Sequence, residues 1–328
     1  MKTVSLIIPC FNESDSLKQT YQAISDVSQR STDFSHEIIF VDDGSQDNTF
    51  SIIYDIAAAD SRVKYITFTR NFGKEAAMLA GLKNASGDAV IIMDADLQHP
   101  PHLILDMLEA YKDGFHQVVA KRTRTNEKPL RKWMTMFYYK LINKLIDVEL
   151  VDGIGDFRLL SRQAVNTLLS MPEYNRFSKG LFSWIGYEKK VIEYENQERV
   201  AGSSKWGFGK LLNYAIDGII SFNSKPLRLL IYMGIIITLL NMLYIGVSFV
   251  QILLFGIDVP GYFTLISSVL FLGGVQLISI GILGEYVGRI FYEVKRRPEY
   301  VIYHTNVKPD PTQTSRHYTV KLPIGDKK

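Results

Sequence analysis

Short apolar runs alternate with amphipathic stretches over the first half of the chain. The apolar runs end in polar or turn-forming residues and cover residues 4–8, 37–41, 63–68 and 89–93. Between them, apolar residues recur at helical spacing and predict helices that begin near Leu17, Thr49 and Lys74. This alternation is typical of a doubly wound, mostly parallel sheet, in which ligands bind at the carboxyl ends of the strands. The chain is therefore predicted to begin with an α/β domain.

Two uncharged runs in the second half are much longer than a strand. Residues 229–255 and 261–284 contain no Asp, Glu, Lys or Arg, and about 20 apolar residues in a helix cross the hydrocarbon core of a bilayer. The linker between the runs has no Lys or Arg, whereas basic residues flank their outer ends: Lys225, Arg228, Arg289, Lys295, Arg296 and Arg297. The positive-inside rule then predicts a two-helix transmembrane hairpin with its linker outside.

These patterns divide the chain into four parts. They are a domain at residues 1–205, a juxtamembrane interfacial helix at 206–225, the hairpin at 226–290 and a tail at 291–328. Two amphipathic stretches, 129–146 and 210–222, are candidates for helices in the membrane interface. Packing against the sheet is an equal alternative for the first of them. The tail after Pro298 is polar, and we expect it to be poorly ordered.

Charge and cysteine content narrow the class of protein. A net charge of +3 over 328 residues does not indicate a nucleic-acid-binding protein, whose basic residues would dominate one face. Cys10 is the single cysteine, so no intrachain disulfide can form, which fits a reducing compartment. The apolar start is too short for a signal peptide. We therefore expect a multi-pass protein of the plasma membrane, with the α/β domain and both termini in the cytoplasm.

A pair of carboxylates follows the fourth predicted strand. If the chain is still extended there, Asp94 and Asp96 point to the same side, with Gln98 next in the row. Carboxylate and amide oxygens suit Mg²⁺ or Mn²⁺, and Mg²⁺ usually takes one or two protein carboxylates and completes its shell with water and substrate phosphate. The sequence therefore predicts a metal ion that bridges the protein and a diphosphate. We expect His99, nearby, to be structural rather than a ligand.

Polar elements also end the first and second predicted strands. Asp42 and Asp43 follow the second strand, where an aspartate can accept hydrogen bonds from a base or a ribose. Pro9, Asn12 and Glu13 follow the first strand, where the backbone could face a nucleobase. A turn with a helix cap is the alternative for each element. Because all of them fall at neighbouring strand ends, a binding role is favoured for the set.

Basic residues gather at three places. Arg70 and Lys74 stand at the start of the third helix, where backbone N–H groups attract anions. Residues 121–132 include Arg122 and Arg131 and lead into an aromatic amphipathic stretch. This favours an anionic lipid headgroup or a diphosphate as partner, with a solvated face as the alternative. A Gly/Ser-rich loop that could fold over phosphates contains the third group: Arg199, Ser204 and Lys205.

Together these motifs resemble those of the family 2 glycosyltransferases. The resemblance is to the polyprenyl-phosphate branch, related to dolichyl-phosphate mannose synthases and bactoprenol glucosyltransferases. It covers roughly residues 3 to 300, and its matching elements are residues 9–13, 42–45, 94–98, 155–159 and 199–205 together with Arg122. It implies a GT-A fold and inverting transfer from a nucleotide sugar to a polyprenyl phosphate such as undecaprenyl phosphate. A UDP-linked donor is favoured, and a GDP-linked donor is the alternative.

The resemblance also implies roles for single residues. Asp94, Asp96 and Gln98 would hold the metal, with Ala95 beside the donor, and Asp43 would bind the base. Arg122 and Arg199 would grip phosphates, assisted by Ser204 and Lys205. Asp156 would occupy the position of the catalytic carboxylate. Because a phosphate monoester is mostly ionised at pH 7, its oxygen needs positioning more than deprotonation. Asp156 is therefore expected to orient the acceptor or the sugar, with a turn or cap role as the alternative.

Two rival functions are a processive polysaccharide synthase and a non-catalytic membrane scaffold that binds nucleotides. The synthases resemble one another in a Gln-x-x-Arg-Trp element that Trp133, Trp184 and Trp206 do not match, and two helices alone cannot enclose a pore. The intact pair of acids argues against the scaffold. Small residues in the second membrane helix would allow close contacts with membrane partners or a homo-oligomer: Gly273, Gly274, Gly281 and Gly284.

Overall fold

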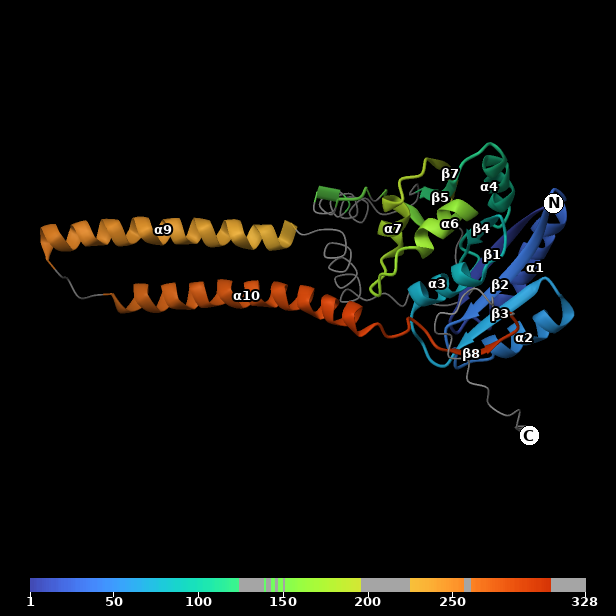
Figure 1. The fold of residues 1–328 in the computed structure, drawn as a ribbon, viewed down its shortest axis with the longest axis horizontal. Helices are drawn as coiled ribbons and strands as arrows, with labels where there is room; N and C mark the ends of the chain where they lie inside the picture. The colour runs from blue at the N-terminus through green and yellow to red at the C-terminus, as the bar shows by residue number, and fades with distance from the viewer. Residues whose placement is uncertain are drawn as a thin grey trace, which may run out of the picture.

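The computed structural model describes residues 1–123, 139, 143–144, 147–149, 151–195, 225–256 and 261–307. Within them, a mixed, mostly parallel sheet has the strand order β7-β5-β6-β4-β1-β2-β3-β8. The strands are β1 (Lys2–Cys10), β2 (Phe34–Asp42), β3 (Val63–Phe68), β4 (Ala89–Ile92), β5 (Gln117–Thr123), β6 (Ile154–Ser161), β7 (Lys189–Glu195) and β8 (Ile302–Thr305). The helices are α1 (Leu17–Arg30), α2 (Thr49–Ala59), α3 (Lys74–Asn84), α4 (Leu103–Lys112), α6 (Arg162–Leu169), α7 (Ser178–Trp184), α9 (Lys225–Phe255) and α10 (Tyr262–Lys295). Figure 1 shows α9 and α10 projecting side by side from the end of the molecule that holds the sheet.

The first half of the chain folds as its hydrophobic pattern predicts. The pairs β1–β2, β1–β4 and β2–β3 are all parallel, and α1, α2 and α3 begin at the predicted residues. Leu6 and Ile8 of β1 pack in one buried cluster with residues of α1, α2 and α4. Ile7 packs in a second cluster with residues of α3 and α6. Because both faces of the sheet are covered, these strands have continuous apolar sequences.

The sheet extends beyond β4 in a way that the hydrophobic pattern does not predict. β6 lies between β4 and β5 and is antiparallel to both, and β7 is parallel to β5. The sequence of β6 carries Asp156 and Arg158 among its apolar residues, which hides its strand character. This inserted strand brings residues from the middle of the chain to the carboxyl end of β4.

The two long apolar helices are present where the uncharged runs predict them. Tyr232–Phe255 and Phe271–Lys295 are long and apolar enough to cross a membrane. α10 continues past the uncharged run to Lys295. Its charged residues Glu285, Arg289 and Glu293 recur every four positions and thus lie along one side of the helix, and Arg289 pairs with Glu285 at 3.6 Å. Their spacing lets the helix continue while its other side stays apolar.

Residues 296–307 after α10 are ordered, which corrects the expectation of a disordered tail for this part of it. β8 adds to the sheet edge antiparallel to β3. Asn306 closes this edge because its Oδ1 accepts from the N–H of Tyr65 at 2.7 Å and its Nδ2 donates to the carbonyl of Val63 at 3.1 Å. A polar four-residue strand gives no periodic signal, so the sequence could not reveal it. The predicted interfacial helix at 206–225, the stretch 210–222, most of 129–146 and residues 308–328 lie outside the described residues.

Candidate active site

The carboxyl end of β4 turns sharply before its acidic residues. β4 ends at Ile92, the chain turns at Ala95 and Asp96, and Leu97 has a φ of +57°. The backbone is therefore not extended here, and the row of Asp94, Asp96 and Gln98 expected for an extended chain does not form. The backbone N–H of Gln98 instead donates to Asp96 Oδ1 at 3.2 Å.

Asp156 reaches this strand end from β6. Ile92 lies opposite Arg158 in the antiparallel register of β4 and β6, so Asp156, two residues before Arg158, lies just beyond the carboxyl end of β4. The Nζ atom of Lys74, the first residue of α3, lies 2.6 Å from Asp94 Oδ1 and 2.6 Å from Asp156 Oδ2. Lys74, Asp94 and Asp156 form a cluster that joins α3, β4 and β6, hereafter the Lys74 cluster.

The opposite charges of the Lys74 cluster stabilise one another in their ionised forms. Loss of water raises the pKa of Asp156, but attraction to Lys74, Lys179 and Arg158 outweighs this and holds the pKa well below its usual range. Loss of water lowers the pKa of Lys74, whereas Asp94 and Asp156 raise it well above its ordinary value. Asp156 is therefore ionised and Lys74 protonated at neutral pH, which suits a site for charged substrates.

The residues beside Asp156 are firmly packed. The buried Phe157 ring stacks on His99 with 4.9 Å between the ring centroids. The guanidinium of Arg158 is buried and lies 3.8 Å from the centroid of the Phe182 ring. Burial lowers the pKa of His99, so its neutral form is favoured. The structure thus gives His99 and Arg158 packing contacts that fix the strand on which Asp156 stands.

The two aspartates at the end of β2 differ in their hydrogen bonds. Asp43 accepts from the backbone N–H groups of Phe72 at 2.6 Å and Gly73 at 2.9 Å, so it fixes the loop that enters α3. Burial raises the pKa of Asp43 to about 6. Asp42 Oδ1 accepts from the N–H of Ser45 at 3.0 Å, whereas its Oδ2 has no hydrogen-bond partner among the described residues. The Oδ2 atom of Asp42 is buried and unpaired within the described part of the chain, so Asp42 stands beside Asp43 as a candidate for contact with a base.

Side-chain hydrogen bonds join the end of β1 to the loop after β2. The N–H of Asn12 donates to Ser45 Oγ, and Asn12 Oδ1 accepts from the N–H of Gln46, both at 2.9 Å. The N–H of Glu13 donates to Thr49 Oγ1 at 2.9 Å. Pro9, the residue before last of β1, is part-buried. The elements that the sequence analysis placed at neighbouring strand ends thus lie against one another.

Gly44 allows the loop after β2 to approach the start of α3. It has a φ of +68°, and a Cβ atom there would lie 2.5 Å from the carbonyl carbon of Arg70. The exposed guanidinium of Arg70 lies 4.1 Å from the centroid of the Phe72 ring. Arg70 is therefore held near the strand ends by its neighbour's ring while its charge remains accessible.

Arg122 is the residue before last of β5 and lies at the same edge of the sheet. It pairs in register with Tyr194 of β7, and its N–H donates to the carbonyl of Gly153 at 2.9 Å. Burial raises the pKa of Tyr194 to about 12, against the opposing effect of Arg122, and the charges of Asp94 and Asp96 add to the rise. Arg122 and Tyr194 are thus close enough to the acids to share their electrostatic field. The other predicted phosphate ligands lie outside the described residues: Arg131, Arg199, Ser204 and Lys205.

The chemistry of Asp94 and Asp96 fits a hard divalent cation whose remaining ligands come from substrate and water. The Asp94 side chain is 31% exposed and already faces one cation, the ammonium of Lys74. Among the described residues, no group of three His, Cys, Asp or Glu side chains could enclose a metal ion. A site with one or two carboxylates is typical of Mg²⁺ bound together with a phosphate.

Glu75 is a residue that sequence reasoning missed. It follows Lys74 in α3, and its carboxylate accepts hydrogen bonds from the hydroxyl of Ser178 and, at 3.3 Å, from the N–H of Ser178. Burial raises the pKa of Glu75 to about 7. The contact fixes the start of α7, and Lys179 at this start acts on the pKa of Asp156. No local pattern links Glu75 to a serine so distant in sequence, so only the fold reveals the contact.

Comparison with known proteins identifies the family. Residues 5–169 match the glycosyl transferase family 2 domain, and residues 225–290 match the GtrB C-terminal hairpin. The chain belongs to glycosyltransferase family 2. This family 2 glycosyltransferase is 55% identical to CsbB of Bacillus subtilis (strain 168), over 93% of this chain and 92% of that protein. It is 45% identical to the SfII prophage-derived bactoprenol glucosyl transferase of Shigella flexneri, over 91% of this chain and 97% of that protein.

Family membership confirms several predictions from the sequence. The chain is a glycosyltransferase with a mostly parallel sheet of GT-A type. Its hairpin match and its two long apolar helices make this family 2 glycosyltransferase a membrane-associated protein. Mannosyl-3-phosphoglycerate synthase from Rubrobacter xylanophilus is one solved structure similar to it, with 19% identity, a TM-score of 0.46, and coverage of 71% of this chain and 75% of that one.

Proposed function

We propose that this glycosyltransferase moves a sugar from a nucleotide sugar, UDP-linked rather than GDP-linked, to a polyprenyl phosphate, with inversion at the anomeric carbon. The Lys74 cluster carries the proposal, because it places two acids and one cation at the strand ends of a domain tethered to apolar helices. The 45% identical Shigella flexneri relative is named as a bactoprenol glucosyl transferase, which supports a polyprenyl phosphate as acceptor. Undecaprenyl phosphate is the expected lipid.

A Mg²⁺ or Mn²⁺ ion, held by Asp94 and Asp96 with Gln98 as the third candidate, would neutralise charge on the departing nucleoside diphosphate. The protein's own residues bind and orient the substrates. Asp43, with Asp42 beside it, would bind the nucleobase, and Asp43 also fixes the loop that enters α3.

Asp156 orients the acceptor or the sugar and performs no obligatory deprotonation, because an acceptor phosphate is mostly ionised at pH 7. Its low pKa supports this role, since a carboxylate that stays ionised is a poor proton acceptor. Lys74 and Arg122 supply positive charge to phosphates from α3 and β5. Arg70, Arg131, Arg199, Ser204 and Lys205 are further candidates for that role.

The proposed orientation follows from the charges that flank the hairpin. Both helices cross the plasma membrane, the linker between them lies outside, and the catalytic domain and both termini lie in the cytoplasm. There the domain meets cytoplasmic nucleotide sugars and the phosphate end of a lipid in the same membrane.

The direct test is a transfer assay with the purified full chain. The protein is incubated with undecaprenyl phosphate and a panel of labelled UDP- and GDP-sugars, with Mg²⁺, Mn²⁺ or a chelator. A labelled lipid that needs the divalent ion is expected, and Asp94→Asn should lower its rate by at least 100-fold, the scale of losing one electrostatic stabiliser of a leaving group. Asp106→Asn, an exposed acid on α4, is the control of equal charge change and should be unaffected.

Three outcomes would contradict the proposal. Full activity in the presence of a chelator would mean that transfer needs no metal ion. A labelled polymer in place of a lipid-linked monosaccharide would favour a processive synthase. Divalent-independent nucleotide binding without any transfer would favour a scaffold.

A further inference from the structure

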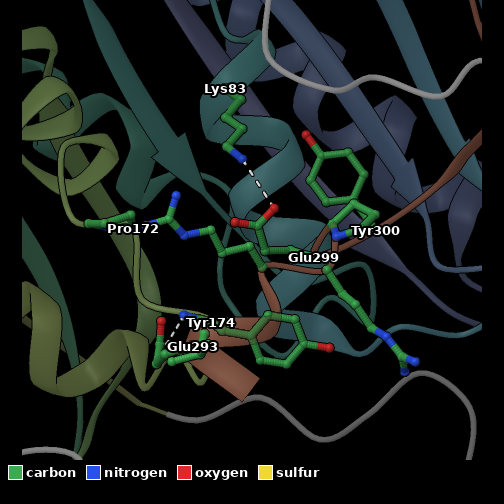
Figure 2. A pocket seen from close by; sticks show the side chains of 10 residues that line it. Lys83, Pro172, Tyr174, Glu293, Glu299 and Tyr300 are labelled. Carbon is green, nitrogen blue, oxygen red and sulfur yellow. Dashed lines mark hydrogen bonds and ion pairs between the residues drawn. The ribbon is translucent and has the colours of Figure 1, made fainter. Parts of the chain in front are cut away.

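A pocket of about 1020 Å³ lies where α10 meets the catalytic domain. Figure 2 shows Lys83 of α3, Tyr174 and Glu299 around it, with Tyr300 at its side. Arg296 and Arg297, the two residues after α10, also line it. The pocket therefore joins the last turn of the hairpin to two separate parts of the domain.

The pocket is separate from the Lys74 cluster. Lys74 begins α3 and Lys83 stands near its end. Nine residues of α helix separate their backbones by about 13 Å along the axis. A ligand in the pocket would thus lie near the opposite end of α3 from Lys74.

The pocket also lies at a defined level relative to the hairpin. The second candidate membrane span ends at Lys295, directly before the two arginines. Tyr174 stacks on Tyr292 of α10 with 5.6 Å between centroids and an angle of 5° between the rings. Tyrosine, arginine and lysine are typical of the interface between hydrocarbon and water. The pocket therefore opens at the charged end of α10, where its tyrosines and arginines suit contact with lipid headgroups.

The acidic residues of the pocket are already engaged. Glu293 Oε1 accepts from the backbone N–H of Tyr174 at 2.8 Å, and Glu299 lies 3.5 Å from the ammonium of Lys83. Arg297 is exposed and forms no ion pair within the described part of the chain. Three basic side chains and two acidic ones line the pocket, so its net charge is positive by one.

The backbone conformation after α10 positions Arg296 and Arg297 at the pocket. Arg296 caps α10 with φ 46° and ψ 41°, the left-handed conformation in which glycine is usual. The chain then turns at Pro298, and Tyr300 is buried with its ring stacked on Phe68 at 4.9 Å. An arginine in a conformation that disfavours side chains indicates that the position of this residue matters.

We propose that this pocket binds the headgroup of an anionic phospholipid from the surrounding membrane. The phosphate lies against Arg296 and Arg297, the tyrosines cover the glycerol region, and the acyl chains run along α10. The lipid thereby bridges the hairpin, the end of α3 and the loop at Tyr174, and fixes the orientation of the catalytic domain on the membrane.

Native mass spectrometry of the detergent-purified full chain tests this site. The protein is given an equal mixture of phosphatidylglycerol and phosphatidylcholine, and the lipids that remain bound are counted. We expect retention of phosphatidylglycerol in the unaltered protein and about tenfold weaker retention in Arg297→Gln, the usual scale for losing a charged hydrogen bond. Lys295→Gln is the matched control. It removes the same charge two residues away, from a side chain that does not line the pocket.

Competition experiments distinguish between the possible ligands. Inorganic phosphate that displaces phosphatidylglycerol at equal concentration would show a site for free phosphate, and displacement by undecaprenyl phosphate with the same dependence on Arg297 would show an acceptor site. Either result, or equal losses in Arg297→Gln and Lys295→Gln, would overturn the proposal. If Arg297→Gln is poorly folded, Arg296→Gln provides the same comparison. Transfer of sugar to polyprenyl phosphate is measured separately, so failure of the lipid site leaves the proposed function standing.

Discussion

At the scale of single residues, Lys74 has a position that its sequence context only partly indicates. A lysine at a helix start predicts phosphate binding, and the structure adds two carboxylates at 2.6 Å. The reason lies in β6, whose antiparallel insertion brings Asp156 to the end of β4, where it shares the Lys74 ammonium with Asp94. Strand-end placement of Asp94 could be predicted from the apolar run before it. The partner of Asp94 could not, because it depends on a register between strands more than fifty residues apart.

Lys74 competes with a metal ion for Asp94, and Lys74→Met should reveal this competition. We expect the variant to bind Mn²⁺ about threefold to fivefold more tightly in the absence of donor, the scale of one partly exposed ion pair. Sugar transfer should fall at least tenfold, because the phosphates lose a positive charge. Titration of free Mn²⁺ by electron paramagnetic resonance and the transfer assay measure the two effects. Lys18→Met removes an exposed charge from α1 and serves as control; equal Mn²⁺ affinity in all three proteins would contradict the competition.

Glu75 makes the stability of the protein depend on pH. Burial raises its pKa to about 7, from an ordinary value of 4.5. Between these two pH values the folded protein keeps a proton that the unfolded chain has lost, so the free energy of unfolding falls as pH rises. The fall should be on the order of 2 kcal/mol for one such carboxyl.

Glu75→Gln should flatten this dependence, because glutamine cannot titrate yet still accepts a hydrogen bond from Ser178. The melting temperature of the detergent-purified protein should drop by about 5 °C between pH 5 and pH 8 in the unaltered chain, and by clearly less in the variant. Glu109→Gln alters an exposed acid on α4 and should retain the full drop. Parallel curves for all three proteins would exclude Glu75 as the source.

At the scale of elements, predictability follows the strength of the periodic signal. The strands β1 to β4 were predicted from their short apolar runs, and the helices α1 to α3 from apolar residues at helical spacing. The hairpin was predicted from the length of its two uncharged runs. β6 was missed because Asp156 and Arg158 interrupt it, and β8 because it is short and polar. Elements stabilised by distant pairing thus leave little trace in their own sequence.

β8 depends on side-chain hydrogen bonds, so Asn306→Ala should weaken its attachment. The substitution leaves the N–H of Tyr65 and the carbonyl of Val63 without their partners at the sheet edge. The expected loss of stability is about 1–2 kcal/mol, measured by denaturant unfolding of the detergent-purified protein. Gln22→Ala removes one exposed hydrogen bond within α1 and should cost far less. Equal losses in the two variants would mean that Asn306 does not secure this edge.

At the scale of the whole molecule, the hairpin leaves the domain and returns to it. α10 leads directly into the pocket and then into β8, which joins the sheet at β3. The catalytic domain is therefore tethered through its own sheet and not by a loose tail. Such a tether would hold the strand ends at a fixed height above the membrane, where a lipid phosphate could reach the Lys74 cluster.

This arrangement predicts which parts of the protein face each side of the membrane. Cys10 is the only cysteine and is 2% exposed, so it gives a low background for labelling of introduced cysteines. Asp258→Cys, in the linker sequence, should react in intact cells with a thiol reagent that cannot cross membranes. Lys18→Cys, exposed on α1, should react only after the cells are made permeable. Reaction of both sites only after permeabilisation would mean that the hairpin enters the membrane without crossing it, and the opposite pattern would invert the proposed orientation. Because the proposed function draws on cytoplasmic nucleotide sugars, that inversion would also remove its proposed donor.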